Sequence, residues 1–206
     1  MKKLTPANID VYVLMKLHEK SPKLQQTSWN YNGGYPRKFK DALSKHLITE
    51  QSKRCAYCGA RLAEEMNHRD HIAPKESHPK FTFIPENLVL ACFHCNTGCK
   101  GRSDTVTVKA DEYTECEFSI VHPYFDEPSR HLEFVGATNA ILIQLVNNSP
   151  KGKATIEMFY LDSPDKTLNR AKEATFEADL DFLGDKWREG FEVVRRANIK
   201  PKLRSV

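Results

Sequence analysis

Apolar side chains recur every three or four positions in two stretches near the N-terminus, the spacing of one face of a helix. The first stretch predicts a helix that begins at an N-cap on Thr5 and ends at about Glu19. The second stretch predicts a helix over residues 36–51. The apolar positions that support these helices are Ile9, Val13 and Leu17 in the first and Phe39, Leu43 and Leu47 in the second.

Three aromatic residues surround the glycine-containing turn at residues 32–34 that separates the two helices: Trp29, Tyr31 and Tyr35. Aromatic rings stack on nucleic-acid bases, but they also pack beneath loops. We expect packing beneath the loop here.

Beyond residue 104 the pattern changes to short β-type runs, which predict strands at 105–109, 118–124, 131–135 and 140–146. The last two runs flank Gly136 and predict a hairpin. Residues 153–161 fit either a strand or a helix. Residues 165–197 are helix-forming.

Composition is that of a globular protein, with 40% hydrophobic and 28% charged residues. No apolar run is long enough to span a bilayer, and the first ten residues lack the apolar core of a signal peptide. We therefore expect a cytoplasmic protein whose cysteines stay reduced.

Positive charge is concentrated near the N-terminus. Residues 1–54 carry eleven Lys and Arg against four Asp and Glu, a net charge of +7, whereas residues 110–206 have a net charge of −4. A basic arm suits the phosphate backbone of nucleic acid. The second helix is the element expected to grip such a backbone, through Arg37, Lys38, Lys40 and Lys45.

Two Cys-x-x-Cys pairs have the spacing of zinc knuckles. Two intervening residues let one tight turn direct both sulfurs at one ion, and four thiolates make a closed structural Zn²⁺ site. Cys99 and Cys116 lie outside this spacing, and His94 is not needed to complete the shell. The predicted zinc ligands are Cys55, Cys58, Cys92 and Cys95.

The 33 residues between the two pairs exceed what a structural zinc site needs. They contain Asp70-His71 and then Asn87, and Asn96 directly follows the last cysteine of the second pair. An imidazole with a pKa near neutrality can deprotonate water, and His71 fits that role. On an extended strand Asp70 points to the opposite side, where its carboxylate can bind a divalent ion.

This order and spacing resemble the HNH endonuclease family, whose core is a ββα-metal motif, over about a quarter of the chain. The resemblance implies hydrolysis of phosphodiester bonds in DNA or RNA, with His71 as the general base and Asn87 holding the loop that carries it. Asp70 and Asn96 are implied ligands of the catalytic ion. Asn96 stands where many members have histidine, and its harder amide oxygen favours Mg²⁺ or Mn²⁺ over Ni²⁺ or Zn²⁺.

His68, two residues before Asp70, is the alternative base. Three cations of the same region are candidate contacts to nucleic-acid phosphates, or else ordinary solvated side chains: Lys75, Lys100 and Arg102.

Segments outside the central stretch are similar to a narrower family, the PtuB-type HNH subunits of Septu anti-phage systems, some of which are encoded beside retrons. These segments are 122–128 (HPYFDEP), 154–156 and 168–170. The resemblance implies a P-loop ATPase partner that restrains the nuclease until infection.

Together these features predict an α+β fold in three parts. They are a basic helical arm at 1–52, a zinc-stapled ββα-metal nuclease core at 53–105, and a mixed, mainly helical region at 106–206 that acts as scaffold or binds a partner. Two other functions stay open. One is a non-catalytic zinc module that only binds nucleic acid, and the other is an interaction subunit whose toxicity comes from its partner.

Overall fold

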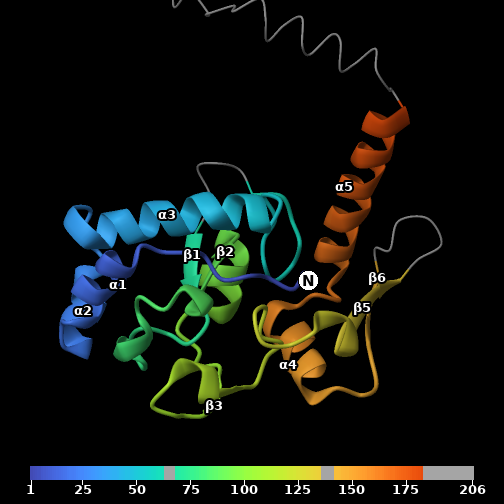
Figure 1. The fold of residues 1–206 in the computed structure, drawn as a ribbon. Helices are drawn as coiled ribbons and strands as arrows, with labels where there is room; N and C mark the ends of the chain where they lie inside the picture. Colours follow the sequence, from blue (N-terminus) through green and yellow to red (C-terminus); the bar gives the residue numbers. More distant parts are fainter. Residues whose placement is uncertain (63–67, 136–141, 183–206) are drawn as a thin grey trace, which may run out of the picture.

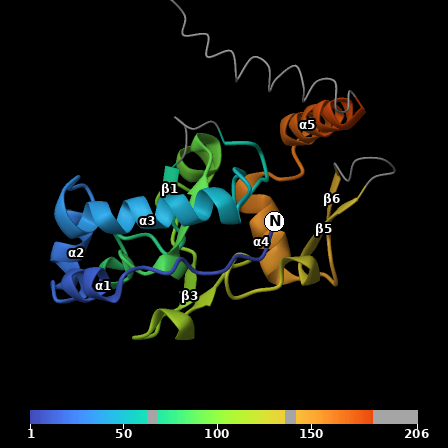
Figure 2. The same cartoon turned by 45° about the horizontal axis from the view of Figure 1, so that its top comes forward.

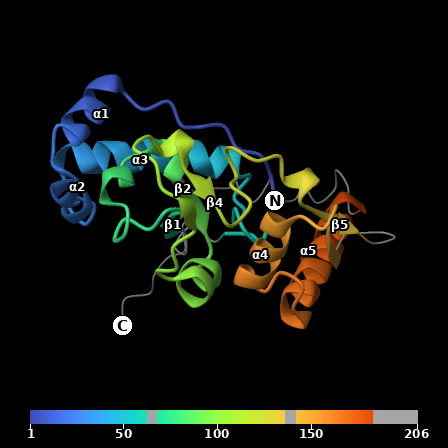
Figure 3. The same ribbon diagram turned by 90° about the horizontal axis from the view of Figure 1, so that it is seen from below.

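The computed structural model describes residues 1–62, 68–135 and 142–182. Its central sheet pairs two short antiparallel strands, β1 and β2. Helices α1, α2 and α3 lie at one end of the molecule, and α4, α5 and the β5–β6 hairpin lie at the other (Figures 1 and 3). The helices are α1 Val11–His18, α2 Pro22–Ser28, α3 Gly34–Glu50, α4 Pro150–Phe159 and α5 Pro164–Phe182. The strands are β1 His68–His71, β2 Leu88–Ala91, β3 Val106–Val108, β4 Glu117–Phe118, β5 Leu132–Val135 and β6 Leu142–Leu145. Mixed helices and small sheets confirm the expected α+β class.

The N-terminal segment is extended and crosses the molecule before α1 begins (Figure 2). The predicted N-cap at Thr5 is therefore wrong. Leu4 is buried, and its N–H donates to the carbonyl of Pro123. The cap is Asp10, whose carboxylate accepts from the N–H groups of Tyr12 and Val13.

Helix α3 confirms the predicted second helix and forms one wall of the core. Its apolar face, Phe39, Leu43 and Leu47, is fully buried. It packs against α1 and β2, and the ring of Phe39 meets that of Phe83 edge-on at 5.2 Å. Helix α2 was not predicted, although Pro22 at its first position is a helix-start signal.

Three two-stranded antiparallel sheets are present among the described residues: β1–β2, β3–β4 and β5–β6. The predicted hairpin around Gly136 is confirmed as β5–β6, although residues 136–141 lie outside the described part. The strand predicted over 118–124 is wrong beyond Phe118. The backbone there leaves the ladder: Val121 N–H donates to the hydroxyl of Thr155, and Pro123 has no N–H to donate.

The ambiguous segment 153–161 lies mostly in helix α4, which is capped by the hydroxyl of Ser149. The predicted helix after residue 165 is confirmed as α5 through residue 182, and its remainder lies outside the described residues. No described helix has the length and apolar character needed to cross a membrane.

Candidate functional site

The four predicted zinc ligands come together. Their sulfur atoms all lie within 4.8 Å of one another, and Cys58 Sγ and Cys92 Sγ are 3.8 Å apart. Four thiolates bound tetrahedrally at about 2.3 Å would be separated by about 3.8 Å, so the cluster fits Zn²⁺. All six cysteines are free thiols, and none of the pairs is bridged. Cys55 and Cys58 follow α3, whereas Cys92 and Cys95 follow β2.

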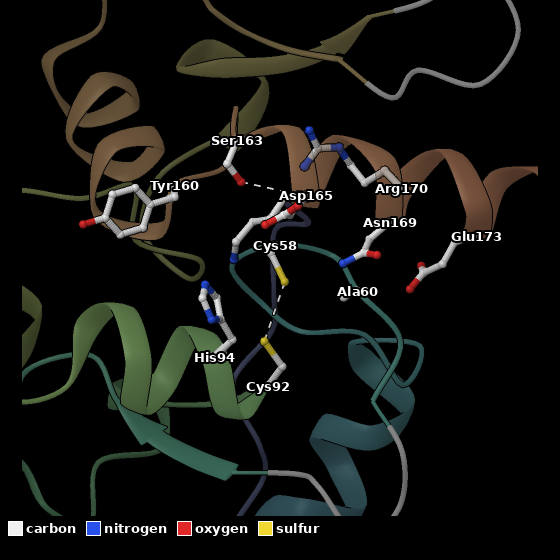
Figure 4. A pocket seen from close by; sticks show the side chains of 11 residues that line it. Cys58, Ala60, Cys92, His94, Tyr160, Ser163, Asp165, Asn169, Arg170 and Glu173 are labelled. Atoms are coloured by element: carbon white, nitrogen blue, oxygen red, sulfur yellow. Dashed lines mark hydrogen bonds between the residues drawn. The ribbon is translucent and has the colours of Figure 1, made fainter.

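Helix α5 covers one side of the cysteine cluster (Figure 4). The ammonium of Lys166 donates to Cys95 Sγ at 3.3 Å. A cavity of about 610 Å³ between the helix and the cluster is lined by Cys58, Cys92 and Arg170, among others. A zinc ion with four thiolates carries a net charge of −2, which these cations offset. The cluster therefore also attaches α5 to the central region.

Alternation along β1 places its side chains on two faces. On one face, Arg69 donates to the hydroxyl of Ser44 in α3, and the ring of His71 meets that of Trp29. On the other face, His68 lies against Phe93, and Asp70 turns towards the helical segment η4, His94–Lys100. The structure thus places Asp70 and His71 on opposite sides of the strand.

Two donors orient the buried carboxylate of Asp70. Its Oδ2 accepts from the hydroxyl of Tyr57 at 2.6 Å, and its Oδ1 accepts from the ammonium of Lys100 at 3.2 Å. Burial raises the pKa of Asp70, while Lys100 and Tyr57 act against that rise. The backbone N–H of His71 adds a third hydrogen bond to this carboxylate, so one of its four lone-pair sites is left for a metal ion. Such outer hydrogen bonds are usual for ligating carboxylates.

The ring of His71 is held in one tautomer. Its Nε2 lies 3.0 Å from the carbonyl oxygen of Thr82. A carbonyl only accepts, so Nε2 carries the proton and Nδ1 keeps its lone pair. Burial lowers the pKa of His71 to about 3, below the near-neutral value expected from the sequence, so the ring is neutral but a weaker base than a free imidazole.

His71 is more enclosed than a freely accessible base would be, with only 6% of its surface exposed. The ring of Trp29 meets it nearly edge-on, with centroids 4.4 Å apart. No described residue forms a hydrogen bond with Nδ1. Nδ1 is nevertheless not among the fully buried side-chain nitrogens that lack a hydrogen-bond partner. It therefore keeps limited access to solvent.

Asn87 holds the loop that carries His71, as its predicted role requires. Its Oδ1 accepts from Ala73 N–H at 2.7 Å, and its Nδ2 donates to the carbonyls of Ala73 and Phe81. These bonds join the segment after His71 to the segment that presents the carbonyl of Thr82.

Two residues that no sequence pattern indicated support Asn87. The hydroxyl of Tyr113 donates to Asn87 Oδ1 at 3.0 Å, and the Nε2 of His122 lies 2.8 Å from the same hydroxyl. The single Tyr113 proton goes to Asn87, so His122 Nε2 must donate. Burial lowers the pKa of His122 to about 3, in keeping with a neutral ring. The one available signal was His122 in the segment 122–128 singled out above.

Asn96 lies in the helical segment η4, His94–Lys100, which has π-type geometry. The N–H of Gly101 donates to the carbonyl of Asn96 five residues earlier at 2.8 Å. Asn96 is partly exposed. Its side-chain amide makes no hydrogen bond to a described residue, so the side-chain oxygen is available to a metal ion. Asn96 lies about one turn before Lys100, the residue that contacts Asp70.

The three predicted phosphate contacts occupy different environments. Lys100 is 2% exposed and also donates to the carbonyl of His71 at 2.7 Å, a position from which it cannot reach a phosphate. Lys75 pairs with Glu76. Arg102 is exposed, so its predicted role remains compatible with the structure.

Comparison with known proteins agrees with the expected family. Residues 55–101 match the HNH endonuclease family. The chain is 25% identical to the Septu protein PtuB of Bacillus mycoides (strain KBAB4) over 158 residues, which covers 66% of this chain and 52% of that protein. It is 31% identical to protein ea31 of Escherichia phage lambda over 81 residues, 39% of this chain and 24% of that protein. The match therefore spans about half the length of PtuB and a quarter of ea31.

Loss of one clustered cysteine should abolish zinc binding. We expect elemental analysis to find one zinc per wild-type chain and much less in Cys58→Ser, because three thiolates leave the shell incomplete. Thermal unfolding of the variant should occur at lower temperature, since structural zinc contributes to folding directly. Cys99→Ser, outside the cluster, is the matched control. Equal zinc content in Cys58→Ser and wild type would contradict the assignment.

Tyr113→Phe should destabilise the fold without loss of zinc. The change leaves the buried Nε2–H of His122 without an acceptor and removes one donor to Asn87, for a cost of about 1–3 kcal/mol. Urea denaturation followed by circular dichroism measures this difference. Tyr160→Phe is the control, because Tyr160 is 60% exposed and its hydroxyl has no described partner. Equal destabilisation by both variants would show that the buried network contributes nothing.

Proposed function

We propose that this protein is a metal-dependent nuclease that hydrolyses phosphodiester bonds through the HNH domain at residues 55–101. The observation that carries the proposal is the His71–Thr82 hydrogen bond. It leaves a neutral imidazole with its Nδ1 lone pair at the position the family uses for its base. Asn87 and its buried partners hold the two segments that form this bond.

In the proposed reaction, His71 Nδ1 takes a proton from the attacking water. The carbonyl of Thr82 stabilises the ring as it becomes positive, because it accepts the Nε2 proton in both charge states. Asn87 maintains the distance between the two segments. These are positional roles that the hydrogen bonds described above support.

Asp70 and Asn96 are the proposed holders of a divalent ion, which when bound would stabilise negative charge on the phosphate and the departing oxygen. Tyr57 and Lys100 keep the Asp70 carboxylate in one orientation. The structural zinc at the four cysteines is separate from this ion and takes no part in the chemistry.

The similarity to PtuB supports a role in anti-phage defence of the Septu type. We propose that the chain works with a P-loop ATPase partner in the cytoplasm, as its family resemblance implies. No contact with such a partner enters the argument for the nuclease site.

One observation favours a second function, a non-catalytic zinc module that only binds nucleic acid. His71 is almost completely enclosed, as a purely structural histidine would be. The two functions differ in what they require of His71: the nuclease needs its Nδ1 lone pair, whereas a binding module needs only its packing.

His71→Ala should abolish cleavage and leave zinc content unchanged. Loss of a general base typically costs about 10²–10⁴-fold in rate. The measurement is nicking of plasmid DNA and cleavage of tRNA with Mg²⁺, beside elemental analysis for zinc. His68→Ala, on the opposite face of β1, is the matched control and should keep most activity. Full activity of His71→Ala with loss of activity in His68→Ala would reverse the assignment, and no cleavage by the wild type would favour the binding module.

Mg²⁺ or Mn²⁺ should support cleavage better than Ni²⁺. The proposed ligands offer only oxygen atoms, from one carboxylate and one amide, and oxygen ligands suit hard cations. The test starts from protein that keeps its structural zinc and has been freed of other divalent ions with a chelator. Each metal is then titrated into the cleavage assay. Activity restored by Ni²⁺ alone would argue against Asp70 and Asn96 as the ligand pair.

A further inference from the structure

A buried lysine fixes the loop between α2 and α3. Lys40 is 7% exposed, although the sequence analysis placed it among the cations that grip a backbone. Its ammonium donates to the carbonyls of Trp29 and Tyr31, both at 3.0 Å, and to Asn32 Oδ1 at 2.9 Å. Three bonds use all three ammonium protons, so this loop has a defined conformation.

The fixed loop turns one aromatic ring inwards and the next outwards. Trp29 is partly buried and meets the ring of His71, as packing predicts. Tyr31, two residues later, is 63% exposed, which the packing expectation did not foresee. Its ring lies close over Gly33, where an added Cβ would approach ring atoms to 2.8 Å. The ring of Tyr31 is therefore exposed to solvent and also held in a defined position over Gly33.

The Tyr31 ring also lies 4.0 Å from where a Cβ at Gly34 would be, next to Tyr35, and both Tyr35 and its neighbour Tyr12 lie beside a cation. Tyr12 and Tyr35 meet edge-on at 5.8 Å, and Tyr12 is 54% exposed. The ammonium of Lys16 lies 5.6 Å from the ring centre of Tyr12, and that of Lys38 lies 5.7 Å from that of Tyr35. We call Tyr12, Tyr31, Tyr35, Lys16 and Lys38 the tyrosine surface.

We propose that the tyrosine surface binds unpaired bases of a nucleic-acid strand. The proposal rests on the proposed nuclease function and specifies its substrate class. Exposed aromatic rings with adjacent cations are the chemistry that binds single strands, because every base has a face that can stack. A base within a duplex already stacks on its neighbours and offers no face to Tyr31.

Charge favours an anionic strand over a protein as the occupant. The N-terminal 54 residues have a net charge of +7. Two carboxylates beside the tyrosines pair with cations, Glu19 with Lys16 and Asp41 with Arg37, so these pairs contribute no net charge. Lys38 has no carboxylate partner among the described residues. The surface therefore offers aromatic rings together with the positive charge of Lys38.

Binding is measured on the His71→Ala background, so that cleavage does not interfere. The probes are a labelled single strand of about twelve nucleotides, in DNA and RNA form, and the blunt duplex of the same sequence. Fluorescence anisotropy should show that Tyr31→Ala weakens single-strand binding about five- to hundredfold, as loss of one stacked base predicts. Tyr31→Phe should retain affinity, because the ring remains. Duplex affinity should change little.

Tyr160→Ala is the matched control, since Tyr160 is similarly exposed but follows α4, away from the arm. Unchanged single-strand affinity in Tyr31→Ala would overturn the proposal. The proposal would also fail if Tyr31→Ala kept its affinity for single strands but no longer co-purified with a P-loop ATPase. That result would assign the surface to a protein partner.

These outcomes are separable from those of the nuclease proposal. Wild-type cleavage with no dependence of binding on Tyr31 defeats the tyrosine surface alone. Tyr31-dependent binding by a wild-type chain that never cleaves defeats the nuclease alone.

Discussion

The four-thiolate cluster is the constraint on which the central region depends. Strands β1 and β2 have four residues each, and a two-stranded sheet of that size is marginal by itself. The cluster joins the turn after α3 to the end of β2 and the start of η4. A bound zinc closes the 33-residue segment that contains Asp70, His71 and Asn87. Lys166 then extends the same attachment to α5.

Within that closed segment, the alternation of β1 separates the two chemical tasks. Asp70 faces Tyr57 and η4, whose Tyr57 hydroxyl and Lys100 ammonium donate to its carboxylate. His71 faces Trp29 and Thr82, which provide an enclosed site and a fixed tautomer. A carboxylate and an imidazole can thus be adjacent in sequence and still have different surroundings. Lys100 links the two faces, because it donates both to Asp70 and to the carbonyl of His71.

Sequence patterns predicted the features that depend on nearby residues. Helix α3, the β5–β6 hairpin and the cysteine cluster follow from local periodicity or short spacing. The start of α1 was missed because burial of Leu4 and its bond to Pro123 outweigh a local capping signal. Tyr113 was missed because it lies 26 residues from Asn87 in sequence. Only the fold reveals such a partner.

The two buried lysines show why charge alone misplaces a site. Basic residues in this protein suggest phosphate contact, yet Lys40 and Lys100 both lie inside, where Lys40 donates to carbonyl oxygens and Lys100 to one carbonyl and the Asp70 carboxylate. Burying an ammonium is costly unless its protons are bonded, and each is satisfied by two or three acceptors. Lys40 holds the Trp29 loop on one side of His71, and Lys100 holds the backbone of His71 from the other. Positive charge therefore shapes the surroundings of the proposed base, and burial takes these two lysines out of reach of a phosphate.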